Sequence, residues 1–224
     1  MNMQRQQSGF TLIEISIVLV IIGLILGGAL KGQELITSAK VRSSINQIDG
    51  VKAAYYAFQD RYRALPGDYI RATVNLPNPP GSINIVNGDS DGLIDTAERA
   101  QVWAQLGVAG FLSGDFDGAV GSTSQYSCPA TSCLPNPFGG TMSVSFDNEG
   151  AGGAGGNSNQ LITGRRMPVS VIAEIDRKID DGIPTSGIFQ ASSNGTFSAC
   201  RSGDDWDVSA ASPRADCAGV IVGL

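Results

Sequence analysis

Carboxylate and amide side chains recur at defined positions in one short acidic segment, residues 87–98. Counted from the start of that segment, they stand at positions 1, 3, 5, 9 and 12. Gly92 at position 6 permits a sharp turn, and Leu93 at position 7 can offer its backbone carbonyl. Ca²⁺ prefers about six to eight oxygen ligands. The segment therefore predicts a calcium-binding loop with the ligands Asn87, Asp89, Asp91, Leu93, Asp95 and Glu98.

The spacing resembles that of an EF-hand loop, with two departures. Asn87 stands where that loop usually has Asp, which removes one negative charge and should weaken calcium binding. The prolines of residues 77–80 disfavour a helix before the loop, whereas residues 97–106 read as a helix after it. Ile94 at position 8 can anchor the loop to a core. The alternative is a surface turn, in which Asp and Gly are common.

Four cysteines and no histidine indicate an oxidising compartment, where disulfides persist. The disulfide candidates are Cys128, Cys133, Cys200 and Cys217. The first two are close enough to pair locally and the last two would close a C-terminal loop, but four cysteines allow three pairings and the sequence selects none. A zinc site is the rival interpretation, which the absence of histidine and the cysteine spacings disfavour.

Glu14 is a single carboxylate inside an apolar segment, residues 10–30. As a helix this segment would extend about 31 Å, the thickness of a bilayer's hydrocarbon core. A carboxylate within a membrane segment is costly and needs a partner. No basic residue lies within reach on the same helix, so the partner is a neighbouring subunit or the segment's own end. A cleaved secretory signal is disfavoured, because no small-residue cleavage site follows the apolar run.

The six residues from Gly9 to Glu14 read Gly-Phe-Thr-Leu-Ile-Glu, with Arg5 ahead and the apolar helix behind. They closely resemble the N-terminal signature of type IV pilins and type II secretion pseudopilins. The resemblance implies that a prepilin peptidase cleaves between Gly9 and Phe10, removing the leader of residues 1–9, and methylates the new amine. It also implies that Glu14 pairs with the N-terminal amine of an adjacent subunit during assembly.

The resemblance implies a structural subunit of a type IV pilus or a type II secretion-type filament. Its partners would be other pilin or pseudopilin subunits, the prepilin peptidase/methyltransferase and an inner-membrane assembly platform. Before assembly the chain would be a single-pass protein of the bacterial inner membrane with its head in the periplasm. The alternative is a minor tip-located subunit that acts as an adhesive or substrate-binding module. Major pseudopilins bind calcium in the head, through a differently placed loop.

No catalytic constellation is apparent in the sequence. It has no histidine for general base work, no G-x-S-x-G turn and no glycine-rich phosphate loop after a strand. We therefore expect no enzymatic activity. The formal net charge of −6 disfavours nucleic acid as a partner.

Helical periodicity continues beyond the membrane segment, over residues 31–64, and ends at Leu65-Pro66-Gly67. One face carries Val41, Ile45, Ile48, Val51, Tyr55, Phe58 and Tyr62. We expect one helix from Phe10 to about Tyr62; many major pilins have Pro where this chain has Lys31, so the helix shape there is left open. Its second half would pack against a head formed by residues 65–224.

The head contains few periodic segments. Residues 141–146 and 187–191 are strand candidates, and a helix is expected from Pro168 to about Asp181. The fold class predicted is α+β, with a long N-terminal helix and a small antiparallel-sheet head that has long loops.

Overall fold

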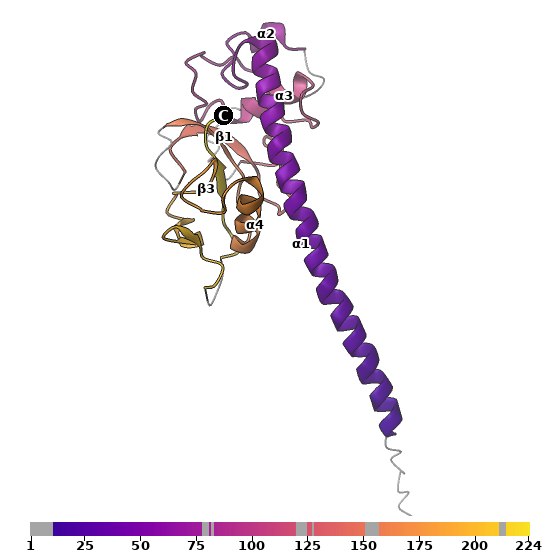
Figure 1. Cartoon of the computed structure of the whole chain (residues 1–224). Coiled ribbons are helices and arrows are strands. Elements are labelled where there is room, and N and C mark those ends of the chain that lie inside the picture. The colour runs from indigo at the N-terminus through magenta and orange to yellow at the C-terminus, as the bar shows by residue number, and fades with distance from the viewer. Residues whose placement is uncertain are drawn as a thin grey trace, which may run out of the picture. The chain divides into compact units, whose positions relative to one another are not determined.

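The computed structural model describes residues 11–77, 81, 83–119, 125–126, 128–150, 157–210 and 214–224. The chain divides into two compact units, residues 1–39 and 40–224. Helix α1 (Leu12–Tyr62) belongs to both units and continues through Lys31 without interruption, as Figure 1 shows. Its extent confirms the single long helix predicted from the sequence. Lys31 forms an exposed ion pair with Glu34 at 2.6 Å.

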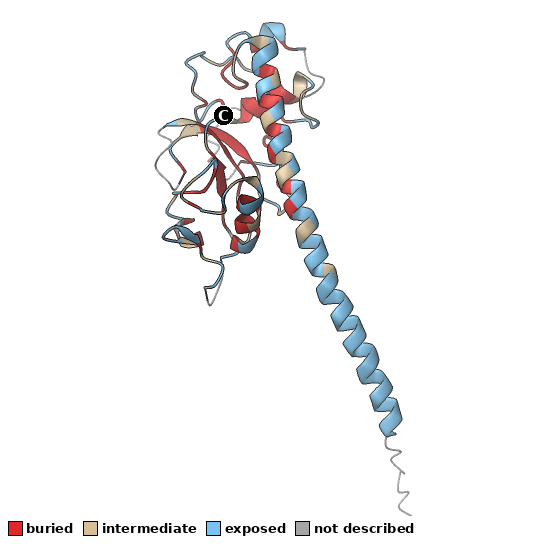
Figure 2. Ribbon diagram, viewed as in Figure 1, coloured by how far each residue is buried: buried red, intermediate tan, exposed pale blue. Residues whose placement is uncertain are grey.

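The first unit consists of the N-terminal part of α1. None of residues 12–39 is buried, although most of them up to Leu30 are large and apolar (Figure 2). By length and composition this helix can cross a membrane, with a mean hydropathy of 2.6 in its most apolar window. The first unit therefore fits a membrane anchor.

The second unit contains the rest of α1 and the hydrophobic core. The predicted apolar face is buried at Val41, Ile48, Val51, Tyr55 and Phe58. After Tyr62 the chain turns through left-handed backbone conformations, with φ +54° at Arg63 and φ +95° at Gly67. The N–H of Gly67 donates to Oε1 of Gln105 at 2.8 Å, so the turn is held against the next long helix of the unit.

A four-stranded antiparallel sheet forms the centre of the head, in the order β1-β2-β6-β3. Its strands are β1 (Ser143–Asp147), β2 (Ser158–Ile162), β6 (Gly219–Ile221) and β3 (Phe189–Ala191). A second, two-stranded sheet pairs β4 (Arg201–Ser202) with β5 (Asp205–Trp206). The α+β fold class is confirmed.

Strands β1 and β3 were predicted, whereas β2 and β6 were not. Both faces of β1 are covered, since Ser143 and Ser145 are fully buried along with Val144. On the serine face, Ser145 accepts a hydrogen bond from Nε of Arg99 at 3.0 Å, at the start of the helix that packs there. Strand β2 begins with three polar residues and β6 begins with glycine, which leaves no period-2 pattern to detect.

Shorter helices complete the head: α2 (Ala72–Asn75), α3 (Arg99–Val108), α4 (Val169–Ile179) and the 3₁₀ helix η1 (Ser198–Cys200). Helix α3 was predicted two residues earlier. Asp95 Oδ1 accepts the N–H groups of Ala97 and Glu98, which makes a turn and delays the helix. Helix α4 begins directly after Pro168, as expected.

Both disulfides lie in the head. Cys128 pairs with Cys133 and Cys200 pairs with Cys217, with Cα atoms 5.9 and 6.0 Å apart. No cysteine is free, which leaves no thiolate for the rival zinc site.

Candidate functional site

The acidic loop, residues 87–98, folds back on itself through its own side chains. Asp89 Oδ1 accepts the N–H of Asp91 at 3.2 Å, and Asp91 Oδ1 accepts the N–H of Leu93 at 2.8 Å. Two residues of the loop adopt left-handed backbone conformations, Ser90 at φ +65° and Gly92 at φ +85°. The turn predicted at Gly92 is therefore present, and Gly92 meets its conformational demand without steric cost.

Asp68, outside the predicted loop, inserts its carboxylate into it. Its side chain is 3% exposed, its Oδ1 accepts the N–H of Ser90, and its Oδ2 accepts the N–H of Gly92 at 2.9 Å. Carboxylate oxygens of Asp68, Asp89 and Asp91 all lie within 4.8 Å of one another. Asp68 is not among the ligands predicted from the sequence, because it follows the turn that ends α1 and shares no spacing with the loop.

Asn87, the residue predicted at position 1, is engaged elsewhere. Its Oδ1 accepts hydrogen bonds from the N–H of Thr73 at 2.9 Å and from the Thr73 hydroxyl at 3.1 Å. The loop N–H groups of Ser90 and Gly92 are taken by Asp68 instead. In this arrangement Asp68 offers the loop a carboxylate from outside it, while Asn87 connects the loop to α2.

Glu98, at position 12, is 7% exposed and closes the loop. Its Oε1 accepts the N–H of Asp89 and its Oε2 accepts the N–H of Asp95, both at 3.3 Å. Burial raises the pKa of Glu98 to about 7, and the charge of Asp68 contributes to that rise. Burial also raises the pKa of Asp68, with a further contribution from Asp91 and Asp89. Keeping these buried, neighbouring carboxylates ionised therefore costs free energy, and a bound cation would reduce that cost.

Ile94 anchors the loop to the sheet. Its side chain is fully buried, and its N–H donates to Oδ1 of Asn159 at 2.9 Å. Nδ2 of Asn159 donates in turn to the carbonyl of Gly92 at 2.9 Å, and Phe146 N–H donates to the carbonyl of Ile94 at 2.8 Å. Strands β1 and β2 thus hold the segment that contains Leu93.

Gly88 allows the close approach of the loop to Asp68. A Cβ atom at this position would lie 2.3 Å from the carbonyl carbon of Asp68, closer than packing allows. Every atom of the loop and of Asp68 that could bind a metal ion is an oxygen, and most of these oxygens belong to carboxylates. Such a set suits a hard divalent cation, because Ca²⁺ and Mg²⁺ prefer oxygen whereas Zn²⁺ is commonly bound by Cys and His.

Glu14 forms a capping box with Thr11 at the start of α1. Its Oε2 accepts the N–H and the hydroxyl of Thr11, both at 2.7 Å, while its own N–H donates to Oγ1 of Thr11 at 3.3 Å. The partner of the carboxylate in a single chain is thus the helix's own end. The Thr-x-x-Glu spacing is the signal that could have identified Thr11. Gly9 and Phe10 lie outside the described residues.

Comparison with known proteins identifies the N-terminal segment. Residues 4–30 match the family model of the prokaryotic N-terminal methylation motif. No curated protein and no solved structure matches the chain. The matched residues include Gly9, Phe10 and Glu14 together with the exposed apolar part of α1. The chain therefore carries, ahead of its α+β head, the N-terminal signature of type IV pilins and pseudopilins.

Proposed function

We propose that the protein is a structural subunit of a bacterial filament of the type IV pilus or type II secretion type. The N-terminal methylation motif carries this proposal. The exposed apolar surface of α1 supports it, because such a helix needs lipid or neighbouring helices to cover it. The role is structural, and it requires no catalytic group.

Processing at Gly9/Phe10 by a prepilin peptidase creates the N-terminus from which assembly starts. In the membrane, Glu14 is satisfied by the capping box with Thr11. In the filament, its carboxylate pairs with the N-terminal amine of a neighbouring subunit. An assembly platform in the inner membrane draws the subunit out of the lipid, and the head lies on the periplasmic side.

The head binds calcium in this proposal, through the acidic loop. The ligands are Asp68, Asp89, Asp91, Asp95 and Glu98, with the carbonyl of Leu93. Asp68 replaces Asn87 of the sequence-based set, because Asn87 is engaged by Thr73. Bound calcium would neutralise the negative charges of Asp68 and Glu98. Burial disfavours the ionised form of both side chains, which is why their pKa values are raised. Since the ion binds only the folded loop, it would stabilise the head before assembly.

Replacing Glu14 by alanine tests the filament role. The Glu14→Ala precursor should be processed by the peptidase, since the cleavage position is unchanged, but should be absent from sheared filaments. Glu34→Ala is the matched control, because Glu34 is an exposed acid of the same helix and lies outside the matched motif. Immunoblots of membrane and sheared fractions provide the measurement. Normal incorporation of the Glu14→Ala chain would contradict the proposal.

A further inference from the structure

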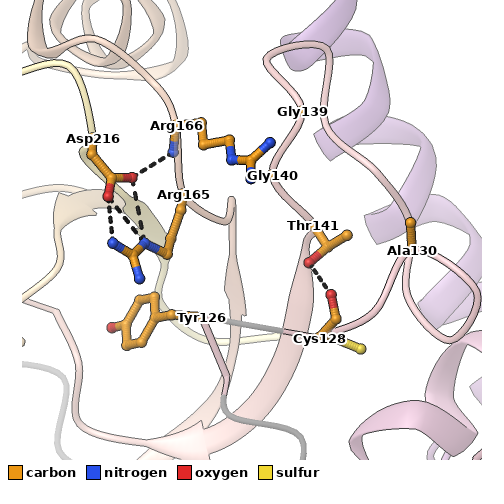
Figure 3. Close-up of a pocket in the computed structure, with 9 residues that line it drawn as sticks. All are labelled: Tyr126, Cys128, Ala130, Gly139, Gly140, Thr141, Arg165, Arg166 and Asp216. Atoms are coloured by element: carbon orange, nitrogen blue, oxygen red, sulfur yellow. Dashed lines mark hydrogen bonds and ion pairs between the residues drawn. The ribbon is translucent and has the colours of Figure 1, made fainter.

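Asp216 illustrates a carboxylate whose charge is compensated within the head. Figure 3 shows it against Arg165, whose Nε donates to Oδ2 of Asp216 at 3.1 Å. The backbone N–H of Arg166 donates to Oδ1 at 2.7 Å. These hydrogen bonds and the charge of the guanidinium hold the pKa of Asp216 below its usual range. Asp216 therefore needs no further cation.

Three carboxylates at the C-terminal end of α4 lack such a partner. Oxygens of Asp176, Asp180 and Asp181 lie within 4.8 Å of one another. None of the three takes part in an ion pair with another residue that the structure describes. The C-terminal end of a helix also carries partial negative charge, which disfavours anions and favours cations. The arrangement therefore concentrates negative charge where positive charge is required.

The basic residues in the last turn of α4 do not supply that positive charge. Nε of Arg177 donates to the carbonyl of Ala173 at 3.1 Å, one turn earlier in the helix. Nζ of Lys178 pairs with Glu174 at 2.7 Å, also one turn earlier. Both side chains are thus engaged along the helix, and the cluster of three carboxylates is left to find its cation elsewhere.

Asp176 contributes a buried oxygen to this cluster. Its side chain is 0% exposed, and its Oδ2 accepts the indole N–H of Trp206 at 2.6 Å. Its Oδ1 is also buried and has no hydrogen-bond donor among the described residues. The neighbouring carboxyl of Asp180 is itself an acceptor when it is ionised. Because a buried ionised carboxylate has to be paired, hydrogen-bonded or bound to a metal ion, this oxygen points to a missing ligand.

The other two carboxylates are fixed by the segment that follows α4. Oδ2 of Asp180 accepts the N–H groups of Ile188 at 2.6 Å and of Phe189 at 2.9 Å. Oδ1 of Asp181 accepts the N–H of Ile183 at 2.8 Å. A carboxylate has about four acceptor sites, so both keep capacity for an ion. The site is therefore formed before any ion arrives.

A proton is the alternative to a metal ion, but it compensates too little charge. Burial and the carboxyl of Asp180 raise the pKa of Asp176 to about 7, so Asp176 can be protonated near neutral pH. That proton would leave the charges of Asp180 and Asp181 without a positive partner. A divalent cation compensates two charges, and three carboxylates favour Ca²⁺ over Mg²⁺, which usually binds one or two and keeps several waters. Asp181 is exposed, so water can complete the coordination.

We propose that Asp176, Asp180 and Asp181 bind a calcium ion at the C-terminal end of α4, separate from the acidic loop. The ion would connect α4 to the segment before β3. We expect a dissociation constant on the order of 1 mM, because the cluster offers fewer carboxylates than the acidic loop does. Calcium concentrations that fill a tighter acidic loop would leave this second site mostly empty. The inference depends neither on filament assembly nor on calcium binding by the acidic loop.

Terbium luminescence tests the proposal on the full chain in detergent micelles at about pH 8. Tb³⁺ replaces Ca²⁺ in oxygen sites and luminesces when a nearby indole is excited, and Trp206 contacts Asp176 directly. The background is Asp89→Asn, which weakens the acidic loop. We expect emission in this background that millimolar calcium displaces. Adding Asp181→Asn should weaken Tb³⁺ binding about tenfold or more, because it removes one of three charges. Asp205→Asn, at an exposed aspartate beside Trp206, is the matched control and should bind normally.

The thermal midpoint in a chelator separates loss of binding from loss of folding. Asp181→Asn keeps an oxygen that can accept the N–H of Ile183, so it should unfold at the temperature of its Asp89→Asn parent. Absence of emission in the Asp89→Asn background would overturn the proposal and leave a proton on Asp176 as the compensating charge. Emission that Asp181→Asn leaves unchanged would also overturn it, since the ion would then be bound elsewhere. Neither result depends on whether the acidic loop binds calcium.

Discussion

Replacing Asp68 by asparagine is expected to remove most of the calcium response of the protein. Asp68 lies outside the acidic loop in sequence, yet its carboxylate meets those of Asp89 and Asp91 within 4.8 Å. The asparagine keeps the shape and one acceptor oxygen for the loop N–H groups. It removes the negative charge, which is the property that calcium requires. The contrasting change is Asn87→Ala, at the position that the sequence pattern alone assigns to a ligand.

The size of the effect follows from linkage between binding and folding. Calcium at about one hundred times its dissociation constant adds about 2.7 kcal/mol to the free energy of unfolding. For a unit the size of residues 40–224, that corresponds to a rise in the thermal midpoint of about 5 to 11 °C. If Asp68→Asn weakens binding about a hundredfold, only about 0.4 kcal/mol, or about 1 to 2 °C, is left at the same calcium concentration.

Asn87→Ala should behave differently. It removes the two hydrogen bonds with Thr73, at an exposed position, and should lower the midpoint by about 2 to 4 °C with and without calcium. The increment due to calcium should persist. The assay is thermal unfolding of the full chain in micelles, with calcium and with a chelator. Loss of the increment in Asn87→Ala but not in Asp68→Asn would refute the geometry proposed here, and no increment in the wild type would refute calcium binding by the loop.

Three further predictions concern the head. Ile94→Ala should destabilise it by about 2 to 5 kcal/mol in denaturant titrations, because it empties a fully buried site beneath the acidic loop; a loss below 1 kcal/mol would mean that the loop is not anchored there. Removing the Cys200–Cys217 disulfide by double serine substitution should cost about 3 kcal/mol, measured in the same way, and an unchanged stability would exclude a constraining role. Asp176 is fully buried, its Oδ2 accepts the indole N–H of Trp206 at 2.6 Å, and burial together with the neighbouring carboxyl of Asp180 raises its pKa to about 7. Because that pKa is raised on folding, the stabilising contribution of the Asp176 carboxyl is fully present below about pH 4 and is lost as pH rises through 7. In a chelator, wild type should therefore lose about 2 to 3 kcal/mol more than Asp176→Asn between pH 5 and pH 8, and parallel pH profiles would contradict this.

Local patterns in the sequence predicted much of this fold. The apolar stripe from Val41 to Tyr62 and the stop at Leu65-Pro66-Gly67 define α1, because helix formation and termination depend on neighbouring residues. The methylation motif and its Glu14 are likewise contiguous. The ligand spacing within residues 87–98 and the turn at Gly92 are also local features, and Gly92 has the positive φ that such a turn needs.

The tertiary structure decided what depends on contacts between distant residues. Strands β2 and β6 are as long as β1 and β3 but lack an alternating pattern of their own, and they are fixed by pairing with β1 and β3. The choice among three disulfide pairings depended on the same packing. The meeting of Asp68 with the acidic loop, and of Arg165 and Arg166 with Asp216, is likewise invisible in sequence spacing. A carboxylate joins a distant loop only when the folded backbone brings it within hydrogen-bonding range. Burial in the folded protein then shifts its pKa. These sites therefore follow from the packed core rather than from any local pattern.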